Sequence, residues 1–321
     1  MEPGPRQLHT EIISWFTANG RDLPWRKPDC TPWGIFVSEI MLQQTPVVRV
    51  LPVWEQWMER WPNPAALAAE PSGEAVRAWG RLGYPRRALR LHAAATAMTA
   101  DFNGTVPDTY PELLTLPGVG SYTAAAVASF AFGRRETVVD TNIRRVHARA
   151  ITGSALPAPA LNAAEMRLAV SLLPDDDAAS VAWNASVMEL GALVCTARSP
   201  KCESCPVLSH CAWVAAGKPA PDYVPKGQAW SGTDRQVRGA IMAVLRHAAS
   251  PVPRAALLGP GDFLPAGILP DDGGDPARPE TTALAQLHAI KAPEKQLERA
   301  LAGLLTDKLA EETRTGLQLP G

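Results

Sequence analysis

Four of the five cysteines in this 321-residue chain stand within residues 195–211, a grouping that could hold a metal. They are Cys195, Cys202, Cys205 and Cys211, in a C-x6-C-x2-C-x5-C spacing. Four thiolates in one loop can bind zinc or an iron–sulfur cluster. Structural zinc sites usually come as two separated C-x2-C pairs, and only Cys202 and Cys205 form such a pair. The spacing favours an iron–sulfur cluster, with zinc and free thiols as the alternatives.

A glycine turn, LPGVGSY over 116–122, precedes a run of small residues typical of a helix. The first N–H groups of a helix have no partner inside it, and the helix dipole favours negative charge there. Gly118 and Gly120 would let such N–H groups approach an anion. The alternative is an ordinary turn without a ligand.

Two acidic residues, Glu39 and Asp140, stand where helices are expected to begin or run. By position alone, Glu39 lies on a helix face and Asp140 precedes a helix as its N-cap. A capping carboxylate can also face a cleft, so neither position excludes a role in acid–base chemistry.

Charge, hydropathy and cysteine content limit the classes of protein to which this chain can belong. The formal net charge is −1, which argues weakly against a nucleic-acid binder, but arginines cluster locally. The clusters are Arg86, Arg87 and Arg90; Arg134 and Arg135; and Arg144, Arg145 and Arg149. No run of 18 apolar residues and no signal-peptide pattern occurs, so we expect a cytoplasmic protein with no membrane partner. In that compartment cysteines are more often ligands than disulfides.

Apolar periodicity and turn residues predict an all-α chain up to about residue 220. We expect helices over 33–44, 46–61, 72–80, 85–99, 121–133, 142–151, 161–173 and 177–193. Trp54, Trp57 and Trp61 share one helix face and are expected in the core. In the tail we expect helices over 235–248 and 294–311, a loop over 259–279 and a strand within 313–319.

Six motifs in order carry a resemblance to a known family. They are RDLPWR (21–26), SEIMLQQT (38–45), LGY (82–84), LPGVGSYTAAAV (116–127), VVDTNIRRV (138–146) and the cysteine spacing. Together they resemble the helix-hairpin-helix DNA glycosylases of the endonuclease III superfamily, and are most similar to the MutY-type A/G-specific adenine DNA glycosylases. The resemblance covers roughly residues 7–225.

The resemblance implies an all-α fold with a six-helix barrel, a helix-hairpin-helix and a helical domain that carries a [4Fe–4S] cluster. The cluster domain would comprise 1–26 and 138–217, the barrel with its hairpin 27–137, a linker 218–231 and a C-terminal module 232–321. It implies that Cys195, Cys202, Cys205 and Cys211 hold the cluster.

The resemblance also implies a function, hydrolysis of the N-glycosidic bond of adenine mispaired with 8-oxoguanine or guanine, in base excision repair. Glu39 matches the acid that protonates adenine N7, and Asp140 matches the carboxylate that stabilises the oxocarbenium ion. Asn142 and Tyr122 match positions that line the site, and Arg26 matches the arginine beside it. Bifunctional relatives have a lysine at the position of Tyr122, so we expect a monofunctional enzyme without strand cleavage.

The implied partner is double-stranded DNA with A:8-oxoguanine or A:G mismatches, bound by a monomer in the bacterial cytoplasm at the nucleoid. The expected DNA contacts are a wedge (Gln43, Gln44, Thr45), an intercalating ring (Tyr84), the hairpin glycines (Gly118, Gly120) and two cations of the cysteine loop (Arg198, Lys201).

Two other functions are open. Thymine glycosylases acting on G:T mismatches share the tyrosine, the aspartate and the cluster, although the QQT wedge counts against them. A cluster-containing DNA-binding protein without catalysis is the second alternative.

The tail departs from the family. Many members carry a Nudix-like β domain that helps to read 8-oxoguanine, but residues 232–321 show few strand signals. They predict a small winged-helix-like module, not a Nudix fold, and its nearly balanced charges give no DNA-binding signal. Recognition of 8-oxoguanine is then expected to rest on Gln44, Thr45 and Tyr84, or on the tail.

Overall fold

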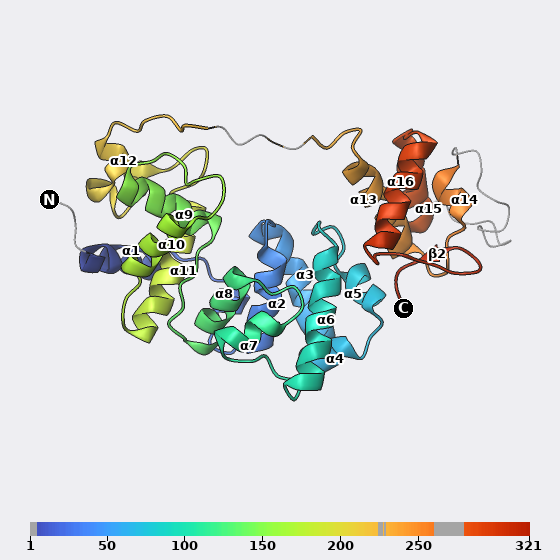
Figure 1. The fold of residues 1–321 in the computed structure, drawn as a ribbon, viewed down its shortest axis with the longest axis horizontal. Coiled ribbons are helices and arrows are strands. Elements are labelled where there is room, and N and C mark those ends of the chain that lie inside the picture. The colour runs from blue at the N-terminus through green and yellow to red at the C-terminus, as the bar shows by residue number, and fades with distance from the viewer. Residues whose placement is uncertain (1–4, 224–226, 228, 260–278) are drawn as a thin grey trace. The chain divides into compact units, whose positions relative to one another are not determined.

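The structure is a computed structural model that describes residues 5–223, 227, 229–259 and 279–321. Helices dominate these residues, and the strands among them are short (Figure 1). The all-α class predicted from the sequence is therefore confirmed. None of the described helices combines the length and apolar character needed to cross a bilayer.

The chain forms two compact units, each built from two separate stretches of sequence. The first unit contains the described residues of 1–39 and 106–226, and the second those of 40–105 and 227–321. The domain boundaries that the family resemblance implies stay a prediction.

The first unit contains the helices that carry the candidate active site and the cysteine loop. They are α1 (Pro5–Asn19), η1 (Pro24–Arg26), most of α2 (Pro32–Leu42), α7 (Tyr110–Thr115), α8 (Ser121–Phe132), α9 (Thr141–His147), the π-helical turn η2 (Ala148–Thr152), α10 (Ala163–Leu172), α11 (Asp177–Leu193), η3 (Cys202–Ser204), η4 (Leu208–His210) and α12 (Ala212–Ala215). Helices α1 and α9 both pack against α11. Their shared core includes Trp183, Val187 and Leu190.

Local sequence explains where these helices begin and end. Side chains of Asp140, Asn162 and Asp176 each accept a hydrogen bond from a backbone N–H in the first turn of α9, α10 and α11. Gly133 ends α8 in the left-handed conformation, with φ +69°. The small residues of α8 are almost all buried, which lets neighbouring elements approach it closely.

The second unit consists of α3 (Val47–Arg60), α4 (Pro64–Ala68), α5 (Ser72–Ala78), α6 (Arg86–Asp101), α13 (Asp234–His247), α14 (Arg254–Leu258), α15 (Pro279–Ala289), α16 (Glu294–Thr306), β1 (Glu311–Glu312) and β2 (Leu317–Gln318). Trp54, Trp57 and Trp61 are buried, which confirms the predicted core face of α3. Trp57 packs edge-on against Trp61 and Trp79, with ring centroids 4.8 and 5.7 Å apart.

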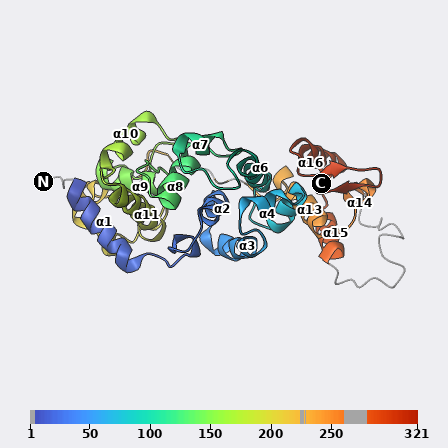
Figure 2. The same ribbon diagram turned by 90° about the horizontal axis from the view of Figure 1, so that it is seen from below.

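The C-terminal module contains the two helices and the late strand predicted from the sequence, and the winged-helix-like fold stays a prediction. Helix α13 packs against α15 and α16 (Figure 2). Strands β1 and β2 pair antiparallel, and an isolated bridge joins Val252 to Leu317. Helices α14 and α15 were not predicted, and residues 260–278 of the predicted loop lie outside the described residues.

Several predicted helix ends differ from the structure by a few residues, and two of them lie at left-handed turns. The helix expected to reach residue 44 ends at Leu42, because Gln44 adopts a left-handed backbone with φ +55°. The helix expected over 294–311 ends at Thr306, and Lys308 two residues later has φ +56°. The spacing of apolar residues along the sequence does not predict these left-handed backbone conformations.

Candidate active site and cluster loop

Glu39 is a carboxyl group held inside the protein. It lies on α2, is 6% exposed, and accepts a hydrogen bond of 2.9 Å from the Tyr122 hydroxyl at the start of α8. Burial is the main cause that raises the pKa of Glu39, to about 7, and the nearby Asp140 raises it too. The Tyr122 hydrogen bond and the charge of Arg26 oppose that rise. Glu39 can therefore hold a proton near neutral pH.

Asp140 performs the capping role expected of it and stays close enough to influence Glu39. Its Oδ1 accepts from the backbone N–H of Ile143 at 2.6 Å, and its Oδ2 accepts from Asn142 Nδ2 at 2.7 Å. Burial raises the pKa of Asp140, and these two hydrogen bonds oppose the rise. The five predicted catalytic residues thus form one connected set in the first unit: Glu39, Tyr122, Asp140, Asn142 and Arg26.

Arg26 is held by a residue that the sequence analysis missed. Its Nη2 donates to Glu189 Oε2 at 2.8 Å, and Arg21 binds the same carboxylate through Nε and Nη2, each at 2.7 Å. Glu189 is fully buried, and the arginine hydrogen bonds lower its pKa to about 2 despite desolvation. The motif RDLPWR supplies both arginines. Glu189 was missed because a single glutamate in the mostly apolar helix α11 does not match any motif.

Arg145 links Asn142 to the start of the cysteine loop. Its Nη2 donates to Asn142 Oδ1 at 2.8 Å and to the Gly191 carbonyl at 2.6 Å, while its Nε donates to the Cys195 carbonyl at 2.6 Å. Gly191 is needed at this crossing, because a Cβ there would lie 2.6 Å from the Asn142 Cβ. A chain of hydrogen bonds therefore runs from the cysteine loop to Asp140.

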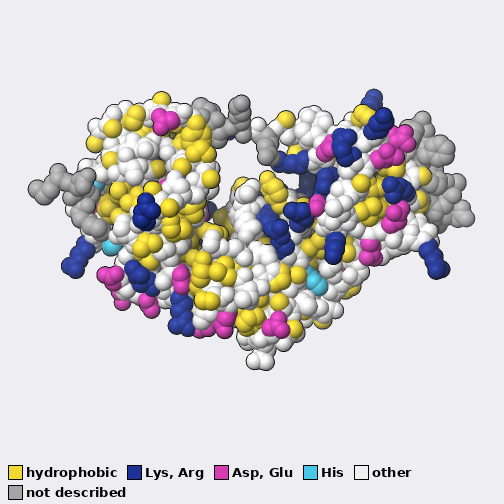
Figure 3. All heavy atoms as spheres, in the orientation of Figure 1, with side chains coloured by type: hydrophobic (Ala, Val, Ile, Leu, Met, Phe, Trp, Pro, Cys, Tyr) yellow, Lys and Arg dark blue, Asp and Glu magenta, His cyan; other side chains and the backbone are white. Residues whose placement is uncertain are grey.

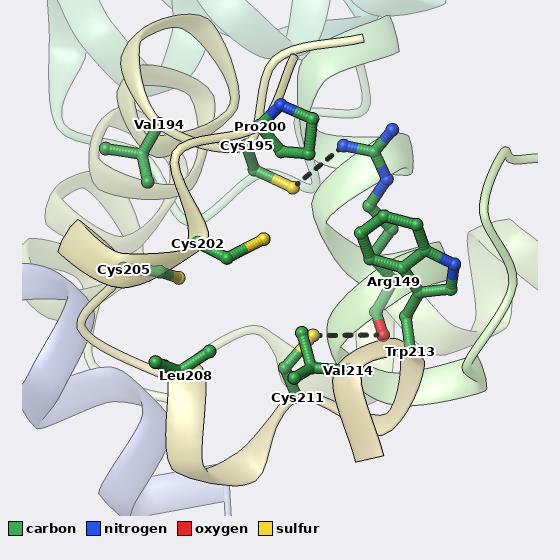
Figure 4. A pocket seen from close by; sticks show the side chains of 10 residues that line it. All are labelled: Arg149, Val194, Cys195, Pro200, Cys202, Cys205, Leu208, Cys211, Trp213 and Val214. Atoms are coloured by element: carbon green, nitrogen blue, oxygen red, sulfur yellow. Dashed lines mark hydrogen bonds between the residues drawn. The ribbon is translucent and has the colours of Figure 1, made fainter. Parts of the chain in front are cut away.

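The four cysteines surround one cavity, as Figure 4 shows, with their sulfur atoms turned toward it. No three His, Cys, Asp or Glu side chains in the described part of the chain lie close enough to share a single ion. The cavity between the sulfurs has an empty volume of about 300 Å³, part of it open solvent. Four sulfur donors around such a space fit a multi-iron cluster.

Arg149 completes the surroundings of the sulfurs. Its Nη1 lies 3.5 Å from Cys195 Sγ (Figure 4). The same Nη1 donates to the Thr196 carbonyl at 2.7 Å. Its guanidinium also stacks over the Trp213 ring, 4.8 Å from the centroid. Burial raises the pKa of the Cys205 thiol to about 11, so the thiolate form there needs positive charge from a bound group.

The predicted wedge and intercalating ring belong to the second unit, and a buried arginine holds them together. Arg87 Nη2 donates to Thr45 Oγ1 at 2.9 Å and to the Gly83 carbonyl at 3.1 Å. Thr45 is buried, whereas Gln44 and Tyr84 are exposed. Both of these exposed residues adopt left-handed backbones, with φ +55° and +47°. Non-glycine residues held in that region are frequent at functional sites.

The remaining predicted DNA contacts lie on the surface of the first unit. Gly118, with φ +80°, and Gly120 are exposed in the turn before α8. Arg198 and Lys201 are exposed in the cysteine loop, and Lys201 N donates to the Val194 carbonyl at 2.9 Å. The loop backbone that carries these cations is thereby fixed.

The buried carboxyl of Glu39 predicts a pH-dependent change in stability for Glu39→Gln. The folded pKa is about 7 and the unfolded value about 4.5, so wild type loses stability as pH rises through this window. Glutamine resembles the protonated form at every pH. We expect Glu39→Gln to match wild type closely at pH 4, below the unfolded pKa, and to exceed its unfolding free energy by up to about 3 kcal/mol at pH 8.5.

Thermal or denaturant unfolding at both pH values measures this difference. The exposed Glu59 on α3 supplies a matched control, because Glu59→Gln makes the same substitution at the protein surface. If the unfolding free energies of Glu39→Gln and wild type differ by the same amount at both pH values, Glu39 has an ordinary pKa.

Two family models match the chain. Residues 37–166 match the HhH-GPD superfamily base excision DNA repair proteins, and residues 195–211 match the iron–sulfur binding domain of endonuclease III. The first match spans Glu39, Tyr122, Asp140 and Asn142, and the second begins and ends at the first and last cysteines of the loop.

Similar structures agree on the fold. A thermostable thymine-DNA glycosylase shares 29% identity at a TM-score of 0.59, over 66% of this chain and 97% of its own. An endonuclease III trapped on DNA matches at a TM-score of 0.57 with 24% identity, over 67% of this chain and 99% of its own, and supports the fold alone.

Similar curated proteins agree on the class of activity. The adenine DNA glycosylase of Mycobacterium tuberculosis is 52% identical over 259 residues, which is 79% of this chain and 84% of the relative. That of Mycolicibacterium smegmatis is 47% identical over 306 residues, 95% and 93% of the two chains. The chain therefore belongs to the adenine DNA glycosylase family within the HhH-GPD superfamily of base excision repair proteins, with a [4Fe–4S] cluster as its cofactor.

Proposed function

We propose that this chain is a monofunctional adenine DNA glycosylase that releases adenine paired with 8-oxoguanine or guanine and leaves an intact strand with an abasic site. The observation that carries the proposal is the buried, proton-holding Glu39 in contact with Tyr122 and beside Asp140. The names of the two mycobacterial relatives support adenine as the base removed.

Glu39 supplies the proton in the proposed reaction. The target adenine must leave the base stack before any side chain reaches it. Protonation of N7 by Glu39 makes the base a better leaving group, and the electrons of the C1′–N9 bond pass to it as that bond breaks. The deoxyribose becomes an oxocarbenium ion, which water attacks at C1′ to give the abasic sugar. The base leaves as neutral adenine that carries the transferred proton on N7, and the proton that the attacking water loses returns to the Glu39 carboxylate or passes to solvent.

Asp140 supplies the negative charge in the same reaction. An oxocarbenium ion is stabilised by a carboxylate close to the sugar, the arrangement also used in glycoside hydrolysis. The backbone N–H of Ile143 and the amide of Asn142 donate to Asp140 and stabilise its anionic form. Burial raises the pKa of both carboxyl groups, but these hydrogen bonds oppose the rise at Asp140, which favours Glu39 for the acid role and Asp140 for the electrostatic role.

Tyr122 explains why no strand cleavage is expected. A lyase reaction through a Schiff base needs an amine, and Tyr122 offers a phenol whose pKa is raised by burial and by the carboxyl groups of Glu39 and Asp140. Its hydroxyl donates to Glu39 and orients that carboxyl. The proposed product is therefore an abasic site that breaks only in alkali.

The proposed DNA contacts come from both units. Gln44 and Tyr84, on strained turns, fill and wedge the gap left by the flipped base. Arg198 and Lys201 bind phosphate from a loop that the cluster makes rigid, and the hairpin turn of Gly118 and Gly120 presents backbone N–H groups to another phosphate. We also propose that the enzyme works as a monomer on the nucleoid of a bacterial cytoplasm, since the two relatives named above are bacterial.

Base release under single-turnover conditions tests the proposed reaction. The substrates are four duplexes with A opposite 8-oxoguanine, A opposite G, T opposite G, and A opposite T. We expect adenine to be released fastest opposite 8-oxoguanine, with strand breaks only after alkali. Glu39→Gln should lower the rate by at least about 100-fold, the usual contribution of a positioned acid, while DNA affinity is kept.

Glu59→Gln is the matched control and should react like wild type. Release of thymine would assign the chain to the G:T-specific enzymes, whose solved representative shares its fold. Breaks without alkali would contradict the monofunctional reaction. DNA binding without release of any base would support a binding protein.

Phosphate binding by the cysteine loop predicts that the DNA affinity of an Arg198→Gln/Lys201→Gln variant depends less on salt concentration than that of wild type. Each phosphate contact contributes about 0.9 to the slope of log affinity against log salt on duplex DNA. We expect the slope to fall by about 2 relative to wild type, while the visible absorbance of the cluster is unchanged. Arg167→Gln, an exposed cation on α10, is the control for loss of surface charge. A slope equal to that of wild type would remove the loop from the DNA interface.

A further inference from the structure

Arg87 is an arginine buried inside the second unit, and no step of the reaction above uses it. The residue is 6% exposed. Burial lowers its pKa to about 10, so the guanidinium is still charged at neutral pH. Its hydrogen-bond partners among the described residues are backbone carbonyls and one hydroxyl, without a carboxylate. A buried charge must be compensated, and here neutral oxygens compensate it.

One group of these oxygens belongs to the end of α2 and the residues just beyond it. Arg87 Nη1 donates to the carbonyls of Ile40 and Met41, each at 3.0 Å, and to that of Gln43 at 2.5 Å. The last carbonyls of a helix have no partner inside it, and the helix dipole makes that end negative. A cation at this place therefore stabilises the end of α2. The same helix carries Glu39, one residue before Ile40.

The second terminal nitrogen of Arg87 joins two turns that are far apart in sequence. Arg87 Nη2 donates to Thr45 Oγ1 at 2.9 Å and to the Gly83 carbonyl at 3.1 Å. The guanidinium also lies 5.2 Å from the Trp79 ring centroid and 5.6 Å from the Tyr84 ring centroid. One side chain thus contacts the turn after α2 and the turn before α6 at the same time.

Each of the two turns carries an exposed residue whose backbone is left-handed. Gln44 has φ +55° and Tyr84 has φ +47°. Such conformations cost energy in residues other than glycine and persist only where the surroundings hold them. Arg87 binds the residue on each side of Gln44 and the residue before Tyr84. The directions in which both exposed side chains point therefore depend on one guanidinium.

The surface around these turns is basic. Figure 3 shows Lys and Arg side chains gathered around the first turn of α6, which begins two residues after Tyr84. Cations on a surface attract the phosphates of duplex DNA. A duplex bound there would meet the exposed side chains of Gln44 and Tyr84, whereas the buried Arg87 would stay behind them.

We propose that Arg87 is a positioning residue for base opening, which ties the Gln44 turn and the Tyr84 turn into one rigid unit so that both side chains enter the duplex together. A flipped base leaves a gap that closes again unless side chains fill and wedge it. Two side chains on one rigid support hold this gap open more effectively than two that move separately. The inference rests on the proposed function, because it needs a base that leaves the stack.

A fluorescent duplex measures base opening separately from bond breaking. It carries 2-aminopurine, whose fluorescence rises when it unstacks, in place of the target adenine opposite 8-oxoguanine. The full-length protein carries Glu39→Gln throughout, so that no base is released. The opening equilibrium is measured for Gln44→Ala, Tyr84→Ala and the double variant, each with Arg87 intact and with Arg87→Lys.

With Arg87 intact, the loss in the double variant should be smaller than the product of the two single losses by at least about fivefold, as for residues of one network. Lysine keeps the positive charge but lacks the two terminal nitrogens that reach both turns. In the Arg87→Lys background the losses should therefore multiply to within about twofold, as for independent sites.

A second variant and a matched control separate positioning from stability. Thr45→Val keeps the side-chain shape but removes the hydroxyl that accepts from Arg87, so it should also lower the coupling, and it decides the test if Arg87→Lys does not fold. Arg246→Lys is the control. Arg246 belongs to the same unit, donates to the Val76 carbonyl at 3.0 Å, and has a pKa that burial lowers to about 10. Arg246→Lys should keep the full coupling even where its melting temperature falls.

Three results would overturn the inference. The first is independent effects of the two alanine substitutions while Arg87 is intact. The second is full coupling in both Arg87→Lys and Thr45→Val. The third is an equal loss of coupling in Arg246→Lys, which would indicate a general effect of lowered stability. Failure of the proposed function is a different result, since it would appear as wild-type protein that releases no adenine from any duplex.

Discussion

The burial of Glu39 beside Asp140 is the constraint on which the rest of the candidate site depends. Two carboxyl groups in a low-dielectric interior cannot both ionise at low cost, so their surroundings must decide which one keeps its proton. Burial raises the pKa of both Glu39 and Asp140, but at Asp140 the hydrogen bonds from the N-terminus of α9 and from Asn142 oppose that rise. The helix boundaries of α2, α8 and α9 matter because they set these two environments.

The neighbouring arginines donate hydrogen bonds to groups other than Glu39, so they do not pair directly with its carboxyl group. Arg26 carries a charge that would ionise Glu39, but it donates directly to Glu189, whose pKa is lowered to about 2. Arg145 is engaged with Asn142, Gly191 and the Cys195 carbonyl. The cysteine loop therefore contacts the site through the residue that positions Asn142. A [4Fe–4S] cluster that orders this loop would support Asp140 without taking part in bond breaking.

Local signals in the sequence predicted much of this arrangement. The cysteine spacing, the capping position of Asp140 and the tryptophan face of α3 each depend on residues near one another in sequence, and the structure agrees with them. The role of Glu189 was not predicted, and Arg145 and Arg87 were named only as members of basic clusters. Each of the three has a partner tens of residues or more away, on an element whose packing a single sequence does not reveal. Gly191 was missed for the same reason, since only the crossing of α9 and α11 shows why a side chain cannot fit there.

The left-handed turns at Gln44 and Tyr84 show the limit of pattern-based reasoning most clearly. Glutamine and tyrosine do not favour a left-handed backbone. Residue propensity therefore predicts that the helix continues through Gln44 and that Tyr84 lies in an ordinary turn. The family motifs indicated that both residues matter, and the backbone gives a physical reason for setting them apart from ordinary helix and loop residues. Their strain is held by the buried hydrogen bonds of Arg87.

The pH dependence of single-turnover adenine release tests the central claim most directly, because it reports the protonation state of Glu39 in the working enzyme. With the pKa of Glu39 at about 7, the rate should be constant in mildly acidic solution and fall as pH rises through that value. Above it, the rate should approach a tenfold decrease per pH unit. A rate that stays constant or rises between pH 7 and 9, with DNA binding intact, would contradict the role of Glu39 as the proton donor.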